Sequence, residues 1–191
     1  ICVEVTAGGV DTLSTYPAGM ATSASLAADG AGFATSSMEN SGNASGTAYY
    51  MGTAESIDSG AAGKICMIDR GNISFYDKVN NCENSGGIGA VIINNEAGML
   101  YATLGDTNDT TIPAVGAALE DRSALLASTT IDITIGTSDY GFMSGTSMAT
   151  PAVSGIAALV WSNHPECTGT EIRDALKATA QDQGAAGHDV Y

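Results

Sequence analysis

The feature that most limits the fold is a pair of apolar runs near the middle of the chain, separated by a segment with helical spacing. Residues 88–93 form a continuous apolar run, and residues 64–69 have the character of a strand. Between them, residues 74–86 place Phe75 and Val79 at i and i+4, on one face of a helix. Uninterrupted apolar runs are typical of strands buried on both faces of a parallel sheet. The order strand, helix, strand therefore predicts a β-α-β unit and an α/β fold.

Three segments further along add to this prediction. Residues 111–117 and then 119–127 repeat the step from strand to helix. Residues 131–135 alternate isoleucine with polar residues, and such a period of two indicates a half-buried strand.

Other segments have weaker patterns. We expect residues 1–17 to form a short strand-like unit, beginning with a strand at residues 1–7. Residues 18–46 are dominated by Ala, Ser, Gly and Thr without a clean period, which predicts loop or irregular structure. Residues 136–140 are predicted to be a linker.

Charge and hydropathy exclude several classes of function. The chain has 21 acidic and 6 basic residues among 191, a formal net charge of −15. Such a chain is repelled by phosphate backbones and by anionic membrane surfaces, so we expect neither nucleic acid nor membrane as a partner. The longest strongly apolar stretch, residues 152–161, is far shorter than the ~18 residues that a membrane span requires. The acidic residues are scattered, which favours a solvated surface over a functional patch.

Residues 144–151 carry the strongest chemical signal. A nucleophilic serine needs an exposed hydroxyl at a helix N-terminus, where free N–H groups and the helix dipole stabilise negative charge. Ser147 meets this requirement if a helix begins near Gly145, and Gly145 and Ala149 are small enough for a substrate backbone to approach. We expect Pro151 to lie in the first helical turn, where its missing N–H costs nothing. The alternative is a buried helix rich in Ala and Gly with a serine near its start.

The sequence of this segment resembles the nucleophile region of subtilisin-like serine proteases. The residues that carry the resemblance are Gly145-Thr146-Ser147-Met148-Ala149-Thr150-Pro151 and, at the end of the following apolar helix, Asn163-His164-Pro165. The match covers residues 140–180. In that family the serine of this motif is the nucleophile, which implies the same catalytic role for Ser147.

The resemblance continues near the start of the chain and has two departures. Residues 3–15 resemble the strand and turn that precede the serine in the family. Gly8 stands where the family usually has Pro, and Ala152 stands where it often has His. That His is not the general base, so Ala152 leaves the assignment of Ser147 intact.

The 120 residues between these two parts resemble a protease-associated domain, a domain that some subtilisin-like proteases carry shortly before the serine. The resemblance rests on residues 63–71, 75–79, 86–95 and 112–115. It implies a sheet or barrel with flanking helices, inserted into the C-terminal part of a subtilisin-like α/β catalytic domain. The implied domains are 1–18 (catalytic, partial), 19–138 (protease-associated insert) and 139–191 (catalytic, nucleophile segment).

Together these resemblances imply a serine endopeptidase that hydrolyses peptide bonds by acyl transfer and is secreted. Its partners would be polypeptide substrates and the remainder of the catalytic domain. The insert would be non-catalytic and would control substrate access or bind protein. A competing hypothesis makes the protease-associated module the working unit and its protease flanks inert. No cofactor is implied for this chain, and a structural calcium in the parent protease has no support in these residues.

The rest of a catalytic triad is missing from the sequence. In this family the general base and its carboxylate precede the serine, in sequence settings that this chain lacks, as it lacks the oxyanion Asn. Its two histidines, His164 at a helix end and His188 in a Gly-rich stretch, are interpreted as structural. The chain also begins without Met and reads as an internal piece of a longer protein. We therefore predict that it hydrolyses peptides poorly or not at all by itself.

Four cysteines occur, without the spacing of a zinc site. Cys66 lies on a predicted strand and Cys82 on the core-facing side of the next helix, so we predict a disulfide between them, with two buried free thiols as the alternative. A disulfide would close a loop of about 15 residues and contribute ~3 kcal/mol. Cys2 and Cys167 would pair with each other or with cysteines elsewhere. An even number of cysteines favours an oxidising compartment.

The apolar helix after Ser147 needs a partner, because residues 152–161 are apolar on nearly every face. In the family this helix is buried against a sheet that this chain mostly lacks. Three outcomes stay open: it packs against residues 1–17, it packs against a second copy, or it stays exposed.

Overall fold

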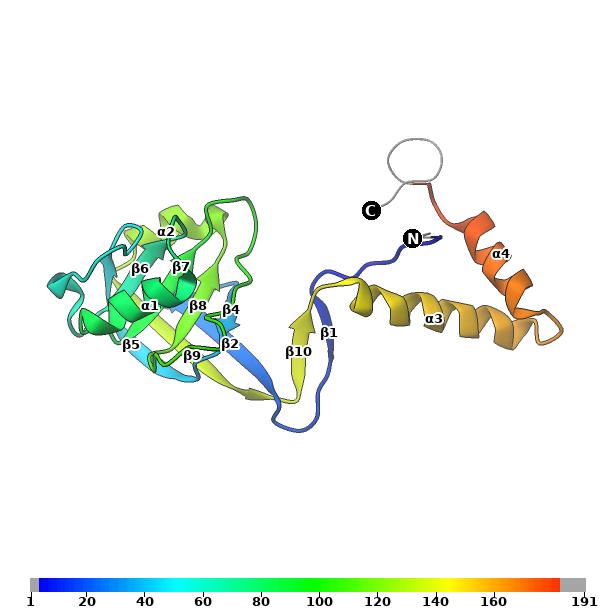
Figure 1. Cartoon of the computed structure of the whole chain (residues 1–191), viewed down its shortest axis with the longest axis horizontal. Helices are drawn as coiled ribbons and strands as arrows, with labels where there is room; N and C mark the ends of the chain where they lie inside the picture. The colour runs from blue at the N-terminus through cyan, green and yellow to red at the C-terminus, as the bar shows by residue number, and fades with distance from the viewer. Residues whose placement is uncertain (1–3, 183–191) are drawn as a thin grey trace. The chain divides into compact units, whose positions relative to one another are not determined.

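The computed structural model describes residues 4–182, which fall into two compact units. Unit 1 comprises Ile1–Thr15 and Phe142–Tyr191, and unit 2 comprises Tyr16–Gly141. Figure 1 shows the elements of both units. None of the described helices combines the length and the apolar character that crossing a membrane requires.

Unit 2 is built on a single mixed sheet. Its strands are β2 (Ala21–Ala28), β3 (Ala31–Phe33), β4 (Ser36–Met38), β5 (Gly42–Tyr50), β6 (Ile65–Asp69), β7 (Gly89–Ile93), β8 (Ala114–Ala117) and β9 (Thr130–Ser138). Their spatial order is β3-β2-β9-β5-β6-β7-β8-β4, with β5 to β8 parallel and the other pairs antiparallel. A hydrogen bond of 3.0 Å between the hydroxyls of Thr22 and Ser37 joins β2 to β4, so the sheet curls toward a barrel.

The predicted β-α-β unit is present as β6, α1 (Phe75–Asn84) and β7. The hydroxyl of Ser74 accepts a hydrogen bond from the backbone N–H of Asp77 and caps the helix. Gly86, with a φ of +82°, follows the end of α1, in a conformation that glycine adopts without steric cost.

Two hydrophobic clusters on opposite sides of the sheet explain why the central strands read as unbroken apolar runs. In β6, Ile65 and Met67 point into one cluster, which the isoleucines of β9 also line. Cys66 and Ile68 point into the other, which contains the buried face of α1. Because both faces are covered, side chains at every position of β6 except the last are buried.

A disulfide between Cys66 and Cys82 joins β6 to α1. The structure thus contains the bond rather than two free thiols, and both cysteines are fully buried. Gly87 lies directly against it, because a Cβ there would stand 2.4 Å from Sγ of Cys82 and 2.6 Å from Sγ of Cys66. The turn that leads from α1 into β7 therefore requires glycine at this position.

The prediction of irregular structure for residues 18–46 was wrong, because β2, β3, β4 and the start of β5 lie there. The buried positions of β2 include Ala21, Leu26 and Ala28. An alanine is large enough at position 28 because β2 pairs with β9, which supplies larger isoleucines to the same cluster. Buried and exposed positions of β2 therefore could not be told apart from the hydropathy of its residues.

Three other boundaries also differ from expectation. Residues 136–138 extend β9 and pair with the first residues of β2, so only Asp139 separates β9 from β10 (Tyr140–Met143). The predicted helix at 119–127 is a 3₁₀ turn, η2 (Leu119–Asp121), followed by α2 (Arg122–Ala127). At the start of the chain, residues 4–9 form no strand and β1 is Thr12–Thr15, while residues 1–3 lie outside the described part.

Unit 1 contains β1, which pairs with β10, and the helices α3 (Thr146–Asn163) and α4 (Gly169–Thr179). Thr168 and Glu171 form a capping box at the start of α4. The side chain of Trp161 lies 3.8 Å from where a Cβ on Gly169 would stand, so the end of α3 packs against the start of α4.

Candidate active site

The structure places Ser147 as the second residue of α3, where it is exposed. Gly145 is the N-cap, with a φ of +154° and no side-chain cap. Its carbonyl accepts hydrogen bonds from the N–H groups of Met148 (3.0 Å) and Ala149 (3.3 Å). Within residues 4–182, neither the hydroxyl nor the N–H of Ser147 has a hydrogen-bond partner. An accessible hydroxyl and a free N–H thus meet at the positive end of a helix dipole.

Pro151 is the sixth residue of α3, so the expectation that it lies in the first turn was wrong. In a regular helix the N–H at this position would donate to the carbonyl of Ser147. Proline has no N–H, and its ring crowds that carbonyl. The hydroxyl of Thr150 donates to the carbonyl of Thr146 at 2.8 Å, so the turn that holds Ser147 is stabilised in part by a side chain.

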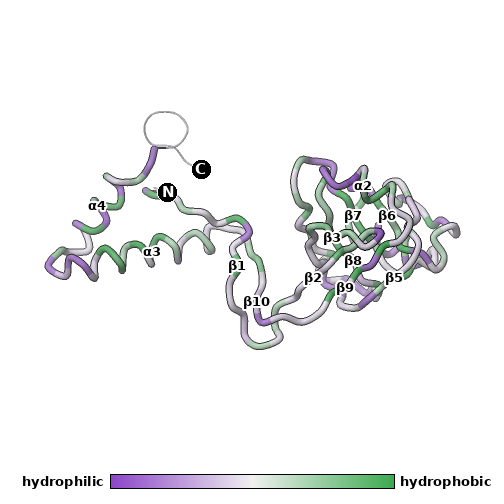
Figure 2. The backbone as a smooth tube through the Cα atoms, turned by 180° about the vertical axis from the view of Figure 1, so that it is seen from behind, coloured by the Kyte–Doolittle hydropathy of each residue, from purple (hydrophilic) through white to green (hydrophobic). Residues whose placement is uncertain are grey.

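The apolar side chains of α3 are exposed in this structure. No residue of the helix is buried, and the exposed fractions reach 51% for Ile156 and 66% for Leu159. Figure 2 shows the apolar colouring along α3. Within one chain, α3 therefore does not bury its apolar side chains against residues 4–17. Packing against a second copy stays an expectation, because the structure contains one chain.

The one histidine among the described residues lies far from Ser147. His164 caps the C-terminal end of α3, and its Nδ1 lies 3.5 Å from a carboxylate oxygen of Glu166. The rise of 1.5 Å per residue puts it about 25 Å along the helix from Ser147. His188 lies outside the described residues. The interpretation of His164 as structural agrees with this geometry.

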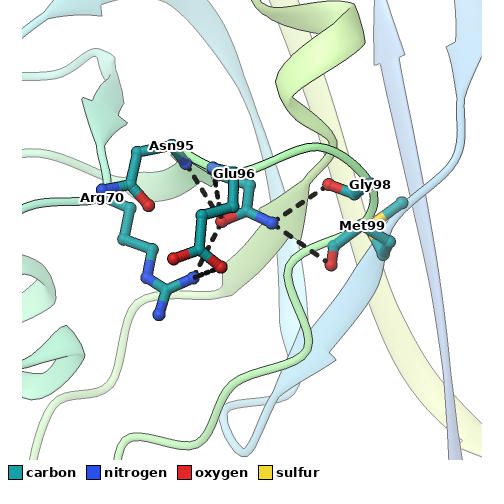
Figure 3. A network of polar contacts seen from close by, with 6 residues as sticks. Arg70, Asn95, Glu96, Gly98 and Met99 are labelled. Atoms are coloured by element: carbon teal, nitrogen blue, oxygen red, sulfur yellow. Dashed lines mark hydrogen bonds and ion pairs between the residues drawn. The ribbon is translucent and has the colours of Figure 1, made fainter.

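Unit 2 carries polar groups at the carboxyl ends of its parallel strands, where open α/β sheets often bind ligands. After β7, Oδ1 of Asn94 accepts hydrogen bonds from the N–H groups of Asn95 and Glu96 (3.0 and 3.4 Å) and from Arg70 (3.0 Å). Its Nδ2 donates to the carbonyl of Gly98 at 3.1 Å. Figure 3 shows the labelled residues that take part in these bonds. The side chain of Asn94 is only 6% exposed. The cluster orders a loop and leaves no buried polar atom of Asn94 for a ligand.

The one lysine of α1 also has a structural role. Lys78 is fully buried, and its Nζ donates to the carbonyl of Thr53. Burial lowers the pKa of Lys78, an effect that the carboxylates of Glu55 and Asp69 oppose.

Among residues 4–182, no group of three or more His, Cys, Asp or Glu side chains could hold a metal ion. Cys167 is a half-buried free thiol, and Cys2 lies outside the described part.

A comparison with known protein families shows which family this chain belongs to. The model of the family described as "Subtilase family" matches residues 37–190. This chain belongs to the subtilase family. The minor extracellular protease Vpr of Bacillus subtilis (strain 168) is 27% identical over 180 residues, which cover 68% of this chain and 22% of that protein. The chain spans less than a quarter of the length of the curated relatives it matches.

Two solved structures show which folds the subtilase chain resembles. The psychrophilic subtilisin-like protease Apa1 from the Antarctic psychrotroph Pseudoalteromonas sp. AS-11 has a TM-score of 0.66 and 30% identity, over 95% of this chain and 48% of that one. The zinc aminopeptidase BSAP from Bacillus subtilis has a TM-score of 0.57 and 21% identity, over 71% of this chain and 35% of that one. Unit 1 makes up only about a third of the chain, so the second likeness of fold includes much of unit 2.

Proposed function

We propose that this chain carries the nucleophile of a secreted serine endopeptidase, and that Ser147 is that nucleophile. The observation that carries the proposal is the exposed hydroxyl of Ser147 beside a free N–H at the start of α3, in a chain of the subtilase family. Attack of Oγ on a peptide carbonyl forms the C–O bond and transfers the hydroxyl proton to a base. The N–H of Ser147 stabilises the oxyanion, the amine leaves with a proton from the base, and water then hydrolyses the acyl-enzyme.

In this proposal the general base and its orienting carboxylate come from parts of the catalytic domain other than residues 4–182. His164 stands at the wrong end of α3 to serve. We therefore predict that this chain by itself hydrolyses peptides poorly or not at all. The substrates of the complete enzyme would be polypeptides. The word "extracellular" in the name of the Vpr protease and the buried disulfide of unit 2 support secretion.

We further propose that residues 19–138 are a non-catalytic protease-associated insert, flanked by catalytic-domain parts at 1–18 and 139–191. Support comes from the likeness of fold to an enzyme with different chemistry. A unit that occurs in both a serine protease and a zinc aminopeptidase does not itself supply either chemistry. The loop-ordering roles of Asn94 and Lys78 agree with this. Such a unit would control access of substrate or bind protein.

The test of the nucleophile uses the complete enzyme and a fluorophosphonate, which reacts with activated serines. We expect labelling at Ser147 and its loss in Ser147→Ala, with a fall in kcat of about 10⁶-fold. Ser154→Ala is the matched control, because Ser154 is an exposed serine on the same helix. Labelling of Ser147→Ala at the rate of the unsubstituted enzyme would contradict the assignment. Labelling of the isolated chain at an enzyme-like rate would contradict its predicted inactivity.

A binding module with inert protease flanks is the alternative that the independent fold of unit 2 allows. The parent gene discriminates between the two. An Asp and a His in subtilisin-like settings upstream of this segment favour the enzyme, and their absence favours the module.

A further inference from the structure

Ser144 and Gly145, which lead into α3, are hydrogen-bonded to the segment around Gly9, which precedes Gly145 by 136 residues. The N–H of Gly145 donates to the carbonyl of Gly9 at 2.7 Å. Two residues further along the segment, the N–H of Asp11 donates to the hydroxyl of Ser144 at 3.0 Å. The backbone at Gly145 is also in a region of φ that side-chain-bearing residues rarely adopt. The entry to α3 is thus fixed from outside the helix.

Gly9 fits this position only because it lacks a side chain. A Cβ at Gly9 would stand 2.6 Å from the carbonyl oxygen of Gly145 and 3.0 Å from Cβ of Ala149. The first of these distances is shorter than real Cβ contacts, and its partner is backbone, so the backbone would have to move. That carbonyl oxygen accepts the hydrogen bonds from Met148 and Ala149 that close the first turn of α3.

We infer that Gly9 is a positioning residue for Ser147. Ser147 lies between Gly145 and Ala149, so a shift of either atom that Gly9 touches turns the peptide planes that carry the N–H and Cα of Ser147. A displacement of about 1 Å in a reacting group costs on the order of 10²-fold in rate. The inference rests on the proposed role of Ser147 as nucleophile.

The chain offers a matched control beside Gly9. A Cβ at Gly8 would meet no atom within 4 Å, and Gly8 needs no positive φ. Gly8→Ala and Gly9→Ala add the same methyl group to the same segment. Any difference between the two variants reports the contact with the start of α3 and not the loss of glycine flexibility.

The experiment measures kcat, KM and the rate of fluorophosphonate inactivation in the complete enzyme, with unfolding midpoints for each variant. We expect Gly9→Ala to lower kcat and the inactivation rate by about 10- to 100-fold, with KM within twofold. Gly8→Ala should leave all three within twofold. A general loss of folded protein would lower the active-site titre and the unfolding midpoint, but not the kcat per titrated site.

A second variant tests the inference if Gly9→Ala does not fold. Ser144→Ala removes the acceptor of the Asp11 N–H without adding volume, and should lower kcat about three- to tenfold at unchanged KM. If Gly9→Ala folds and its kcat is unchanged, the inference about Gly9 is overturned. If Gly9→Ala does not fold, an unchanged kcat in Ser144→Ala overturns it. Neither result affects the proposed role of Ser147. An unsubstituted complete enzyme that does not react at Ser147 overturns the proposed function, and this inference with it.

Discussion

At the scale of single residues, Asp69 connects three elements of unit 2. Its carboxylate accepts hydrogen bonds from Nε and Nη2 of Arg122, at 2.8 and 2.7 Å, and from the hydroxyl of Tyr50 at 2.5 Å. These donors come from α2 and β5, whereas Asp69 ends β6. The Arg122 guanidinium, followed by the Tyr50 hydroxyl, holds the pKa of Asp69 below its ordinary value of 3.8, although partial burial opposes this. A bidentate pair of this kind is stronger than an ordinary surface ion pair.

This lowered pKa predicts how stability depends on pH. A carboxyl whose folded pKa is below its unfolded pKa stabilises the fold above the unfolded value, and that contribution is lost as pH falls through the folded pKa. Asp69→Asn should therefore lower the free energy of unfolding by about 1–2 kcal/mol at pH 7. The difference from the unsubstituted protein should shrink steadily below pH 3.8.

Urea unfolding at pH 7, 5, 4 and 3 measures this difference. Asp106→Asn is the control, because Asp106 is an exposed loop residue without a hydrogen bond or ion pair in the described residues. A difference for Asp69→Asn that stays constant from pH 7 to pH 3 would contradict the prediction.

At the scale of elements, the sequence predicted those whose apolar pattern is strong and local. The strand β6, the helix α1 and the strand β7 follow from uninterrupted runs and a capped helical face. The strands β2 and β4 could not be predicted, because their alanines and serines become strand only through pairing with β9 and β8, and β3 in turn pairs with β2. The residues that pair with β2 and β4 lie between 76 (Met38 to Ala114) and 117 (Ala21 to Ser138) positions away in sequence.

In the candidate site, too, the sequence predicts only residues whose pattern is local. Ser147 could be found because its motif is local. Gly9 could not be assigned a role, because the atoms that exclude its side chain belong to Gly145 and Ala149, more than 130 residues later. A glycine in a sequence does not reveal whether it serves a turn or a close approach.

The turn between α1 and β7 gives a prediction for an element. Gly87→Ala would place a methyl group inside contact distance of both disulfide sulfurs, so we expect a loss of about 2–3 kcal/mol in the free energy of unfolding. Gly32→Ala in the edge strand β3 meets no atom within 4 Å and should change stability by less than about 0.5 kcal/mol. Urea unfolding and quantitation of free thiols provide the measurement. Equal stability of the two variants would show that the turn has room for a side chain.

At the scale of the whole molecule, the two units differ in how much apolar surface they bury. Every buried apolar side chain in residues 4–182 belongs to unit 2, except Ile172 of α4. Unit 1 instead exposes large apolar side chains, among them Val10, Phe142 and Leu159. Burial of apolar surface is the main favourable contribution to folding. Unit 2 therefore has a core of its own, whereas the described residues of unit 1 form none.

This asymmetry predicts the behaviour of the separated parts. Residues 16–141 expressed alone should unfold in one cooperative transition, with the far-ultraviolet spectrum of a mixed sheet and an intact Cys66–Cys82 disulfide. Residues 142–191 alone should show weak helicity and bind a hydrophobic dye, because α3 exposes apolar side chains along its length. Circular dichroism, urea unfolding and dye fluorescence distinguish these states. Cooperative unfolding of residues 142–191, or its absence in residues 16–141, would contradict the prediction, because each result would place the stabilising core in the other unit.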